Sequence, residues 1–172
     1  MDVFLFGAGA SFGSGNCIPH PPPLGTQLFD ILDARGGFVS TLSDEQKSKF
    51  RPRFEVGMAA LYEESNMLGL ALLREMGGYF AGFLPGHGNY YIELISHLKE
   101  RRKPFTLATT NYDLLIEFVI NAVGSKFNYV PHDAPDQIVL YKIHGSCNFL
   151  PYMGNMRITG ATYFLAPVDL LP

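Results

Sequence analysis

The chain has 172 residues, of which 47% are hydrophobic and 17% charged, and its formal net charge is −3. This composition predicts one folded domain with a sizeable core and excludes extensive disorder. The small negative charge gives no electrostatic basis for binding nucleic acid, which requires a patch of Lys and Arg.

Cysteine usage and hydrophobic runs limit the class of protein further. Cys17 and Cys147 form no C-x-x-C pair, so we expect neither a disulfide framework nor a four-Cys zinc site, and no His or Cys pair has the spacing of metal ligands. Asp2 stands where a signal peptide carries basic residues. Residues 66–84 are the one membrane candidate, but they include Arg74 and several glycines. We therefore expect a soluble, cytoplasmic protein that contacts no membrane.

The first third of the chain combines one strand with helices. An apolar strand is expected at 3–6, and a Gly- and Pro-rich segment at 12–24 follows it. That segment can form neither a regular helix nor a central strand, and is either a surface connection or a mobile cover over a ligand. A helix is expected at 25–34. The capping-box pair Ser43 and Gln46 predicts that a second helix begins there.

The middle of the chain is predicted to be helical. Pro52 suits the first turn of a helix, and residues 66–84 form another with an expected break near 77–78. The clearest amphipathic helix is expected at 89–102. Residues 25–102 are therefore interpreted as a helical insertion between the first and second strands.

From Pro104 onward the pattern alternates between strands and a helix. The expected elements are a strand at 104–108, a helix at 114–123, strands at 127–130 and 138–143, and a possible further strand at 162–166. This alternation is typical of an α/β fold, here a Rossmann-like, mostly parallel sheet.

Three of the expected strands run directly into short glycine-rich or polar signatures. They comprise Gly7, Ala8, Gly9, Ala10 and Ser11 after the first strand, Thr109, Thr110, Asn111 and Asp113 after the second, and His144, Gly145 and Ser146 after the last. Ligands of open parallel sheets bind outside the carboxyl ends of the strands. We therefore expect the three signatures to share one crevice.

Each signature also has a simpler explanation. The glycine run could cradle a phosphate or form a tight turn with Ser11 as a helix N-cap, and Phe12 breaks the dinucleotide fingerprint of dehydrogenases. Asn111 and Asp113 could be helix caps, although together with Thr109 and Thr110 they supply more polar groups than one helix start needs. His144 could be structural or a general base.

In this order, the segments GAGAS, TTNYD and KIHGS resemble motifs of the sirtuin-like superfamily, and most nearly the bacterial sirtuin-like NAD hydrolases of antiphage defence. The resemblance covers residues 2–150 and implies that residues 1–172 are a single, C-terminally incomplete NAD-binding domain. It implies that residues 7–11 hold the pyrophosphate of NAD. It further implies these roles: Asn111 positions the nicotinamide ribose and the attacking water, Asp113 orients that ribose and the loop, His144 acts as the base, and Thr109, Thr110, Gly145 and Ser146 contact NAD.

The implied activity is NAD glycohydrolysis, which gives nicotinamide and ADP-ribose or a cyclised product. Alternatives are a non-catalytic NAD or ADP-ribose sensor, and an NAD-dependent protein deacylase, which is disfavoured because the chain lacks the four cysteines of the deacylase zinc module. Family members continue beyond the His motif, so a further segment or another chain is expected to complete the site. The expected partners are NAD and either a second copy of the chain or a defence-system protein.

Overall fold

A four-stranded parallel sheet forms the body of the protein in the computed structural model, which describes residues 2–130 and 137–149. The strand order is β1-β4-β6-β5. The strands are β1 Asp2–Phe6, β4 Phe105–Thr109, β5 Lys126–Asn128 and β6 Gln137–Lys142. The parallel α/β architecture expected from the alternation of elements is confirmed. The further strand expected at 162–166 lies outside the described residues.

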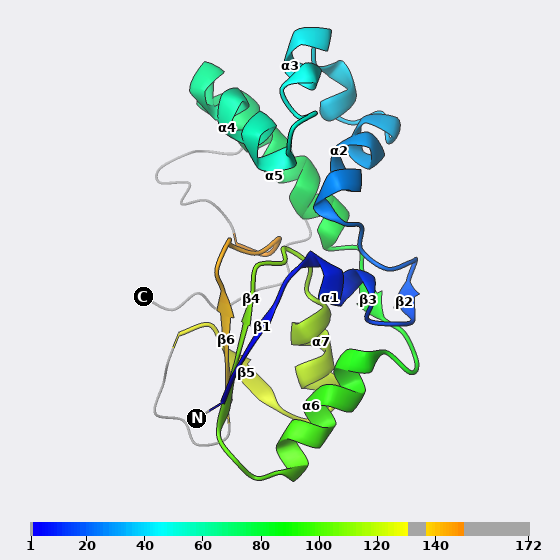
Figure 1. Cartoon of the computed structure of the whole chain (residues 1–172), viewed down its shortest axis with the longest axis vertical. Coiled ribbons are helices and arrows are strands. Elements are labelled where there is room, and N and C mark those ends of the chain that lie inside the picture. Colours follow the sequence, from blue (N-terminus) through cyan, green and yellow to red (C-terminus); the bar gives the residue numbers. More distant parts are fainter. Residues whose placement is uncertain (1, 131–136, 150–172) are drawn as a thin grey trace, which may run out of the picture.

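Helices cover one face of this sheet. Helix α6 (Tyr90–Glu100) packs against α7 (Leu115–Ala122), and α7 contacts β5 (Figure 1). Phe4, Leu107 and Leu140 are aligned across β1, β4 and β6 and belong to the core on this side. Helix α6, which falls within the helical insertion expected at 25–102, thus packs on the body of the protein.

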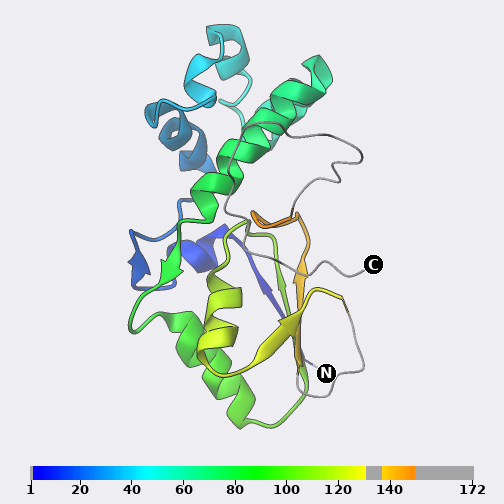
Figure 2. The ribbon, with the colours of Figure 1, turned by 180° about the vertical axis from the view of Figure 1, so that it is seen from behind.

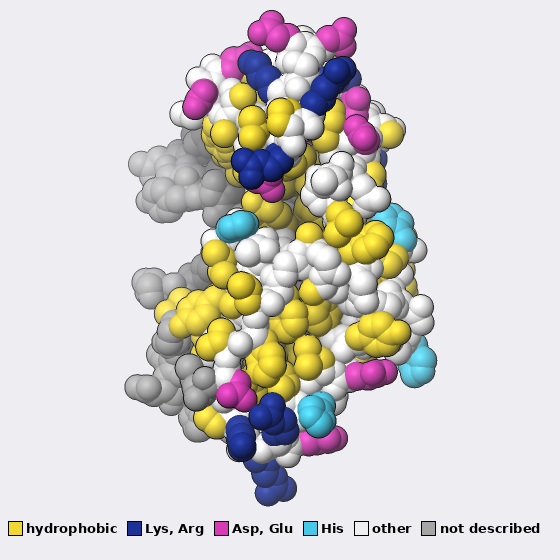
Figure 3. Space-filling model, viewed as in Figure 1, with side chains coloured by type: hydrophobic (Ala, Val, Ile, Leu, Met, Phe, Trp, Pro, Cys, Tyr) yellow, Lys and Arg dark blue, Asp and Glu magenta, His cyan; other side chains and the backbone are white. Residues whose placement is uncertain are grey.

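The opposite face of the sheet is apolar and exposed in places. Val3 and Leu5 of β1 are 63% and 65% exposed, and Tyr141 and Ile143 are also exposed. A hollow of about 650 Å³ lies against Tyr141 and Ile143. Figure 3 shows hydrophobic side chains gathered over the body, whereas charged ones concentrate toward the two ends of the molecule. In the described part of the chain, no helix has the length and hydrophobicity that crossing a membrane requires.

A helical lobe stands beyond the carboxyl ends of the strands (Figure 1). It consists of α2 Gly25–Ala34, the short 3₁₀ helix η1 Val39–Thr41, α3 Asp44–Ser48, α4 Phe54–Glu64 and α5 Asn66–Phe80. The predicted capping box at the start of α3 is confirmed: the Gln46 amide N–H donates to Ser43 Oγ at 3.2 Å, and the Ser43 N–H donates to Gln46 Oε1 at 2.9 Å.

The expected break at 77–78 is wrong, because α5 continues through both glycines. Glycine lowers helix propensity by only about 1 kcal/mol. The neighbouring side chains of Met76, Tyr79 and Phe80 are all buried. Packing of this helix face therefore outweighs the local preference for a break.

The segment at 12–24 is tied to the body rather than loose. Helix α1 (Ala8–Phe12) follows β1 directly, and β2 (Cys17–Ile18) pairs antiparallel with β3 (Leu84–Pro85), as Figure 2 shows from behind. Asn89 is fully buried, and its Nδ2 donates to Ser14 Oγ and to the Asn16 carbonyl, both at 3.0 Å. The connection is therefore an ordered strap along the side of the body.

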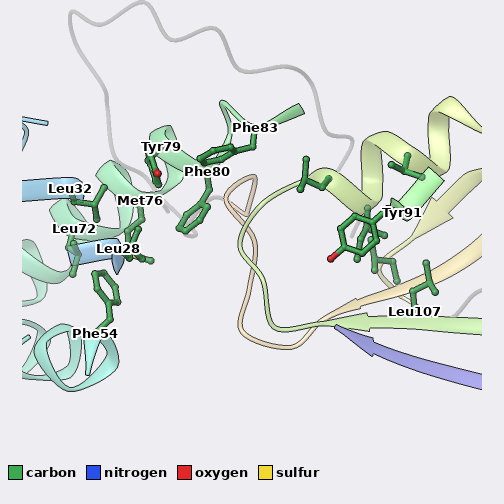
Figure 4. Packing of buried hydrophobic residues seen from close by; sticks show 14 of the residues in the cluster. Leu28, Leu32, Phe54, Leu72, Met76, Tyr79, Phe80, Phe83, Tyr91 and Leu107 are labelled. Atoms are coloured by element: carbon green, nitrogen blue, oxygen red, sulfur yellow. The ribbon is translucent and has the colours of Figure 1, made fainter. Parts of the chain in front are cut away.

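Lobe and body share one continuous hydrophobic core (Figure 4). The lobe contributes Leu28, Leu32, Phe54, Leu72 and Met76, and the body contributes Tyr91 and Leu107 among others. Tyr79, Phe80 and Phe83, at and just after the end of α5, lie between the two groups. The lobe is therefore packed onto the strand ends through an aromatic cluster.

Candidate functional site

Strand register brings the three sequence signatures to one edge of the sheet. Phe6 of β1 is aligned with Thr109 of β4, which is aligned with Lys142 of β6. The residues that follow these positions therefore emerge side by side. A cavity of about 170 Å³ lies at this edge, and residues of the helical lobe also line it. It is lined by Ala8, Ser11, Gly25, Leu28, Phe54, Glu55, Met58, Phe80, Thr110, Asn111, Tyr112, Asp113 and His144.

Only some of the predicted site residues line this cavity. The predicted site residues that line it are Ala8, Ser11, Thr110, Asn111, Asp113 and His144. The other predicted residues, all described, do not line it: Gly7, Gly9, Ala10, Thr109, Gly145 and Ser146. Members of all three signatures therefore meet at one cavity, as the strand-end argument predicted.

The glycine run opens a helix at its first residue. Gly7 is the N-cap of α1, with an extended backbone at φ −111° and ψ −177°. The alternative that Ser11 caps this helix is wrong, because Ser11 lies inside α1 and is buried. A Cβ added at Gly9 would meet no atom within 4 Å, so packing of the fold does not demand glycine there.

Asn111 fastens the loop after β4 to helix α1, which follows β1. Its side-chain Nδ2 donates to the Gly7 carbonyl at 3.0 Å and to Ser11 Oγ at 2.8 Å. Its backbone N–H donates to Thr109 Oγ1 at 3.0 Å. Ser11 Oγ also lies 3.2 Å from the Tyr91 hydroxyl. Asn111 is therefore a buried bridge between that loop and α1, and not a helix cap.

Asp113 is not the N-cap of α7 that the simpler explanation proposed, because Leu114 occupies that position; Asp113 lies one residue before it. Its Oδ1 accepts a hydrogen bond from the Leu115 N–H, at 3.1 Å, at the start of α7. Burial raises the pKa of Asp113 above its ordinary value, while hydrogen bonds from Leu115 and Ser11 and the charge of Lys142 oppose the rise. The carboxyl group is thus held in a setting that disfavours its charged form.

The His144 side chain is exposed, in contrast to the buried side chains of Asn111 and Asp113. The Ile143 N–H before it donates to the Thr109 carbonyl at 2.9 Å, which ties this loop to β4. Gly145 after it has φ +86°, a conformation that glycine adopts without strain. Gly145 therefore serves the turn that presents His144. The Ser146 hydroxyl is buried and has no hydrogen-bond partner among the described residues.

Two features of the site were not predicted from the sequence: the residues of α4 that line the cavity from the lobe side, called the roof below, and a buried ion pair behind the cavity. Phe54, Glu55 and Met58 of α4 line the cavity from the lobe, and no local pattern marks them as site residues. Lys142 Nζ lies 3.2 Å from Glu117 Oε1, with both side chains almost fully buried. A signal for this pair was present, since each residue is a lone charge in an otherwise apolar stretch.

Comparison with known proteins adds no assignment. No protein-family model and no curated protein matches the chain. Among the described residues, no group of three or more His, Cys, Asp or Glu side chains could hold a metal ion. A functional hypothesis therefore depends on the cavity itself and on the motif resemblance.

Proposed function

We propose that this domain binds NAD at the strand-end cavity and hydrolyses the nicotinamide–ribosyl bond, with a role in antiphage defence inferred from the motif resemblance alone. The observation that supports the chemistry best is the meeting of the start of α1, Asn111 and exposed His144 at one cavity. Its volume of about 170 Å³ is below the roughly 300–1,000 Å³ of typical ligand pockets. We therefore assign it to the nicotinamide–ribose half, with the rest of NAD outside it.

The start of α1 suits the pyrophosphate of NAD. The first N–H groups of a helix lack intrahelical acceptors and favour a bound anion. Gly7 is exposed and Gly9 has open space where a Cβ would be, so a ligand can approach the backbone closely. The glycines are then explained by the ligand rather than by packing.

Asn111 and His144 would orient and activate water. As the bond between C1′ and nicotinamide breaks, the water oxygen bonds to C1′, nicotinamide leaves as a neutral molecule, and the proton of water passes to His144. Asn111 Nδ2 already donates to Gly7 and Ser11, so its carbonyl oxygen is the atom that would accept a hydrogen bond from the water. Asp113 would help to hold the same loop in place by accepting a hydrogen bond from the Leu115 N–H at the start of α7.

A second candidate function is a non-catalytic sensor of NAD or ADP-ribose. It is favoured by the engagement of Asn111 and Asp113 in hydrogen bonds within the protein. In that case both side chains shape the loops, and ligand binding needs no contribution from His144. The two candidates differ in whether nicotinamide is released.

The deciding experiment measures nicotinamide release from NAD by the wild type and by His144→Ala. We expect the variant to lose about 10²- to 10⁴-fold in rate, the usual contribution of a general base. Because His144 is exposed, the free energy of unfolding of the variant should differ from that of the wild type by no more than about 0.5 kcal/mol. The matched control is His97→Ala on exposed α6 surface, which should release nicotinamide normally. Equal rates in all three proteins would contradict the assignment, and binding without release would support the sensor.

A further inference from the structure

A buried ion pair lies directly behind the cavity. The side chains of Lys142 and Glu117 are 1% and 6% exposed, and Nζ lies 3.2 Å from Oε1. Lys142 Nζ also donates to the main-chain carbonyl of Asp113 at 2.6 Å. Removing two charges from water often costs more than their attraction returns, and apolar residues would fill such a place as well. The pair therefore points to a role in holding the surrounding loops in a fixed position rather than in stabilising the fold.

The pair belongs to a set of links between the two loops that carry the proposed machinery. The backbone N–H of Ile143 donates to the Thr109 carbonyl, and that of Cys147 donates to the Tyr112 carbonyl, both at 2.9 Å. Lys142 adds a charged side-chain link to Asp113. His144 lies between these tied positions, so its placement relative to the loop after β4 depends on them.

Further hydrogen bonds fix Glu117, which in turn fixes the ammonium group. The Tyr129 hydroxyl donates to Glu117 Oε1 at 3.1 Å, and Asn148 Nδ2 donates to the Tyr129 hydroxyl at 3.0 Å. The network thus runs from α7, past the end of β5, to the loop that follows β6. Glu117 Oε2 and Asn148 Oδ1 have no hydrogen-bond partner among the described residues, so the bonds through Glu117 Oε1 are the ones that hold this network together.

We propose that Lys142 is a positioning residue for the hydrolysis proposed above, on which this inference rests. Its ammonium group holds the carbonyl of Asp113 and thereby sets the separation of Asn111 and His144, while Glu117 keeps the ammonium in place. Lys142 does not line the cavity, so it acts through the loops and not on the substrate. A displacement of about 1 Å in such a site can reduce a rate by about 10²-fold.

The test compares Lys142→Met, Glu117→Gln and the double variant Lys142→Met/Glu117→Gln. Lys142→Met leaves Glu117 buried without its cation, so we expect a lower melting temperature and a kcat reduced by about 10²-fold with KM little changed. The double variant leaves no lone buried charge. It should regain much of the melting temperature but keep the low kcat, because nothing holds the Asp113 carbonyl. The matched control Lys47→Met breaks the partly exposed pair with Asp33 in the lobe and should retain full kcat.

A second readout separates this inference from the proposed function. NMR resonances of the Asn111 side-chain amide and the His144 imidazole should shift in Lys142→Met and in the double variant, and stay unchanged in Lys47→Met. If the wild type releases no nicotinamide, the proposed function fails, and these resonances still decide whether Lys142 positions the loops. Unshifted resonances, or a double variant that regains wild-type kcat together with its melting temperature, would overturn the positioning role.

Discussion

The side-chain amide of Asn111 joins the loop after β4 to helix α1, about 100 residues earlier in the chain, through its bonds to Gly7 and Ser11. Replacing it by Ala would remove these two hydrogen bonds, each worth about 0.5–1.5 kcal/mol, although the Gly7 carbonyl keeps the Ala10 N–H and the Ser11 hydroxyl keeps the Tyr91 hydroxyl as partners. A loss of activity in Asn111→Ala would therefore mix loop disruption with any catalytic effect. His144, which is exposed, gives the cleaner test of chemistry.

Cys147 offers a prediction about reactivity. Burial raises the pKa of its thiol to about 12; the nearby charges of Glu117 and Asp113 add to the rise, and Lys142 opposes it. Alkylation requires the thiolate, so in a Cys17→Ser variant the remaining Cys147 should react very slowly with iodoacetamide near pH 8. Its rate should still be rising above pH 9, the ordinary cysteine value. Alkylation at pH 8 as fast as in the denatured protein would contradict this prediction.

At the scale of elements, local patterns predicted most helices and strands. Helix α2 matches its expected range of 25–34, and β4, β6 and α7 match within one or two residues. Hydrophobic periodicity and capping act within a few residues, so sequence carries them directly. Helix α1 was missed because five small and apolar residues carry no period. The continuity of α5 depends on packing partners that no local window contains.

Gly9 in α1 provides a test at the scale of a single element. Alanine favours helix by about 1 kcal/mol over glycine, and a Cβ at Gly9 meets no atom within 4 Å. Gly9→Ala should therefore raise the free energy of unfolding by up to about 1 kcal/mol while weakening NAD binding, because the new methyl group lies where the pyrophosphate would approach. Thermal unfolding and calorimetric titration with NAD measure the two effects.

The matched control for that prediction is Gly78→Ala in α5. Gly78 is also an exposed helical glycine with open space around its Cβ position. It should give a similar gain in stability and leave NAD affinity unchanged. Equal affinity for NAD in both variants would contradict the assignment of the glycine run to the NAD-binding site.

At the scale of the whole molecule, the lobe and the site are physically joined. Phe80 of α5 stacks on Tyr112, with ring centroids 6.0 Å apart, in the loop that also carries Asn111 and Asp113. The sequence could predict that the three signatures meet at one edge, because the carboxyl ends of parallel strands lie at the same edge of a sheet. The roof formed by α4 could not be predicted, because it depends on how the lobe packs onto the body through residues far apart in the chain.

A shared core predicts that lobe and body unfold together. Leu72 in the lobe and Leu107 in the body are both fully buried. Each Leu→Ala change should destabilise the protein by about 2–5 kcal/mol and lower one common melting temperature by roughly 4–20 °C. Circular dichroism at 222 nm and tyrosine absorbance should report coincident transitions. Two separate transitions, with each variant shifting only one, would show independent units.

The pairing of β1 with β4 has a consequence for how the protein is made. Asp2 is aligned with Phe105, roughly 100 residues later, and everything between them must be synthesised before the sheet can begin. At about 5–20 residues per second, the first strand waits on the ribosome for about 5–20 s. During that interval the apolar side chains of Val3 and Leu5 have no neighbouring strand. We therefore expect nascent chains of this protein to be clients of chaperones that shield apolar segments.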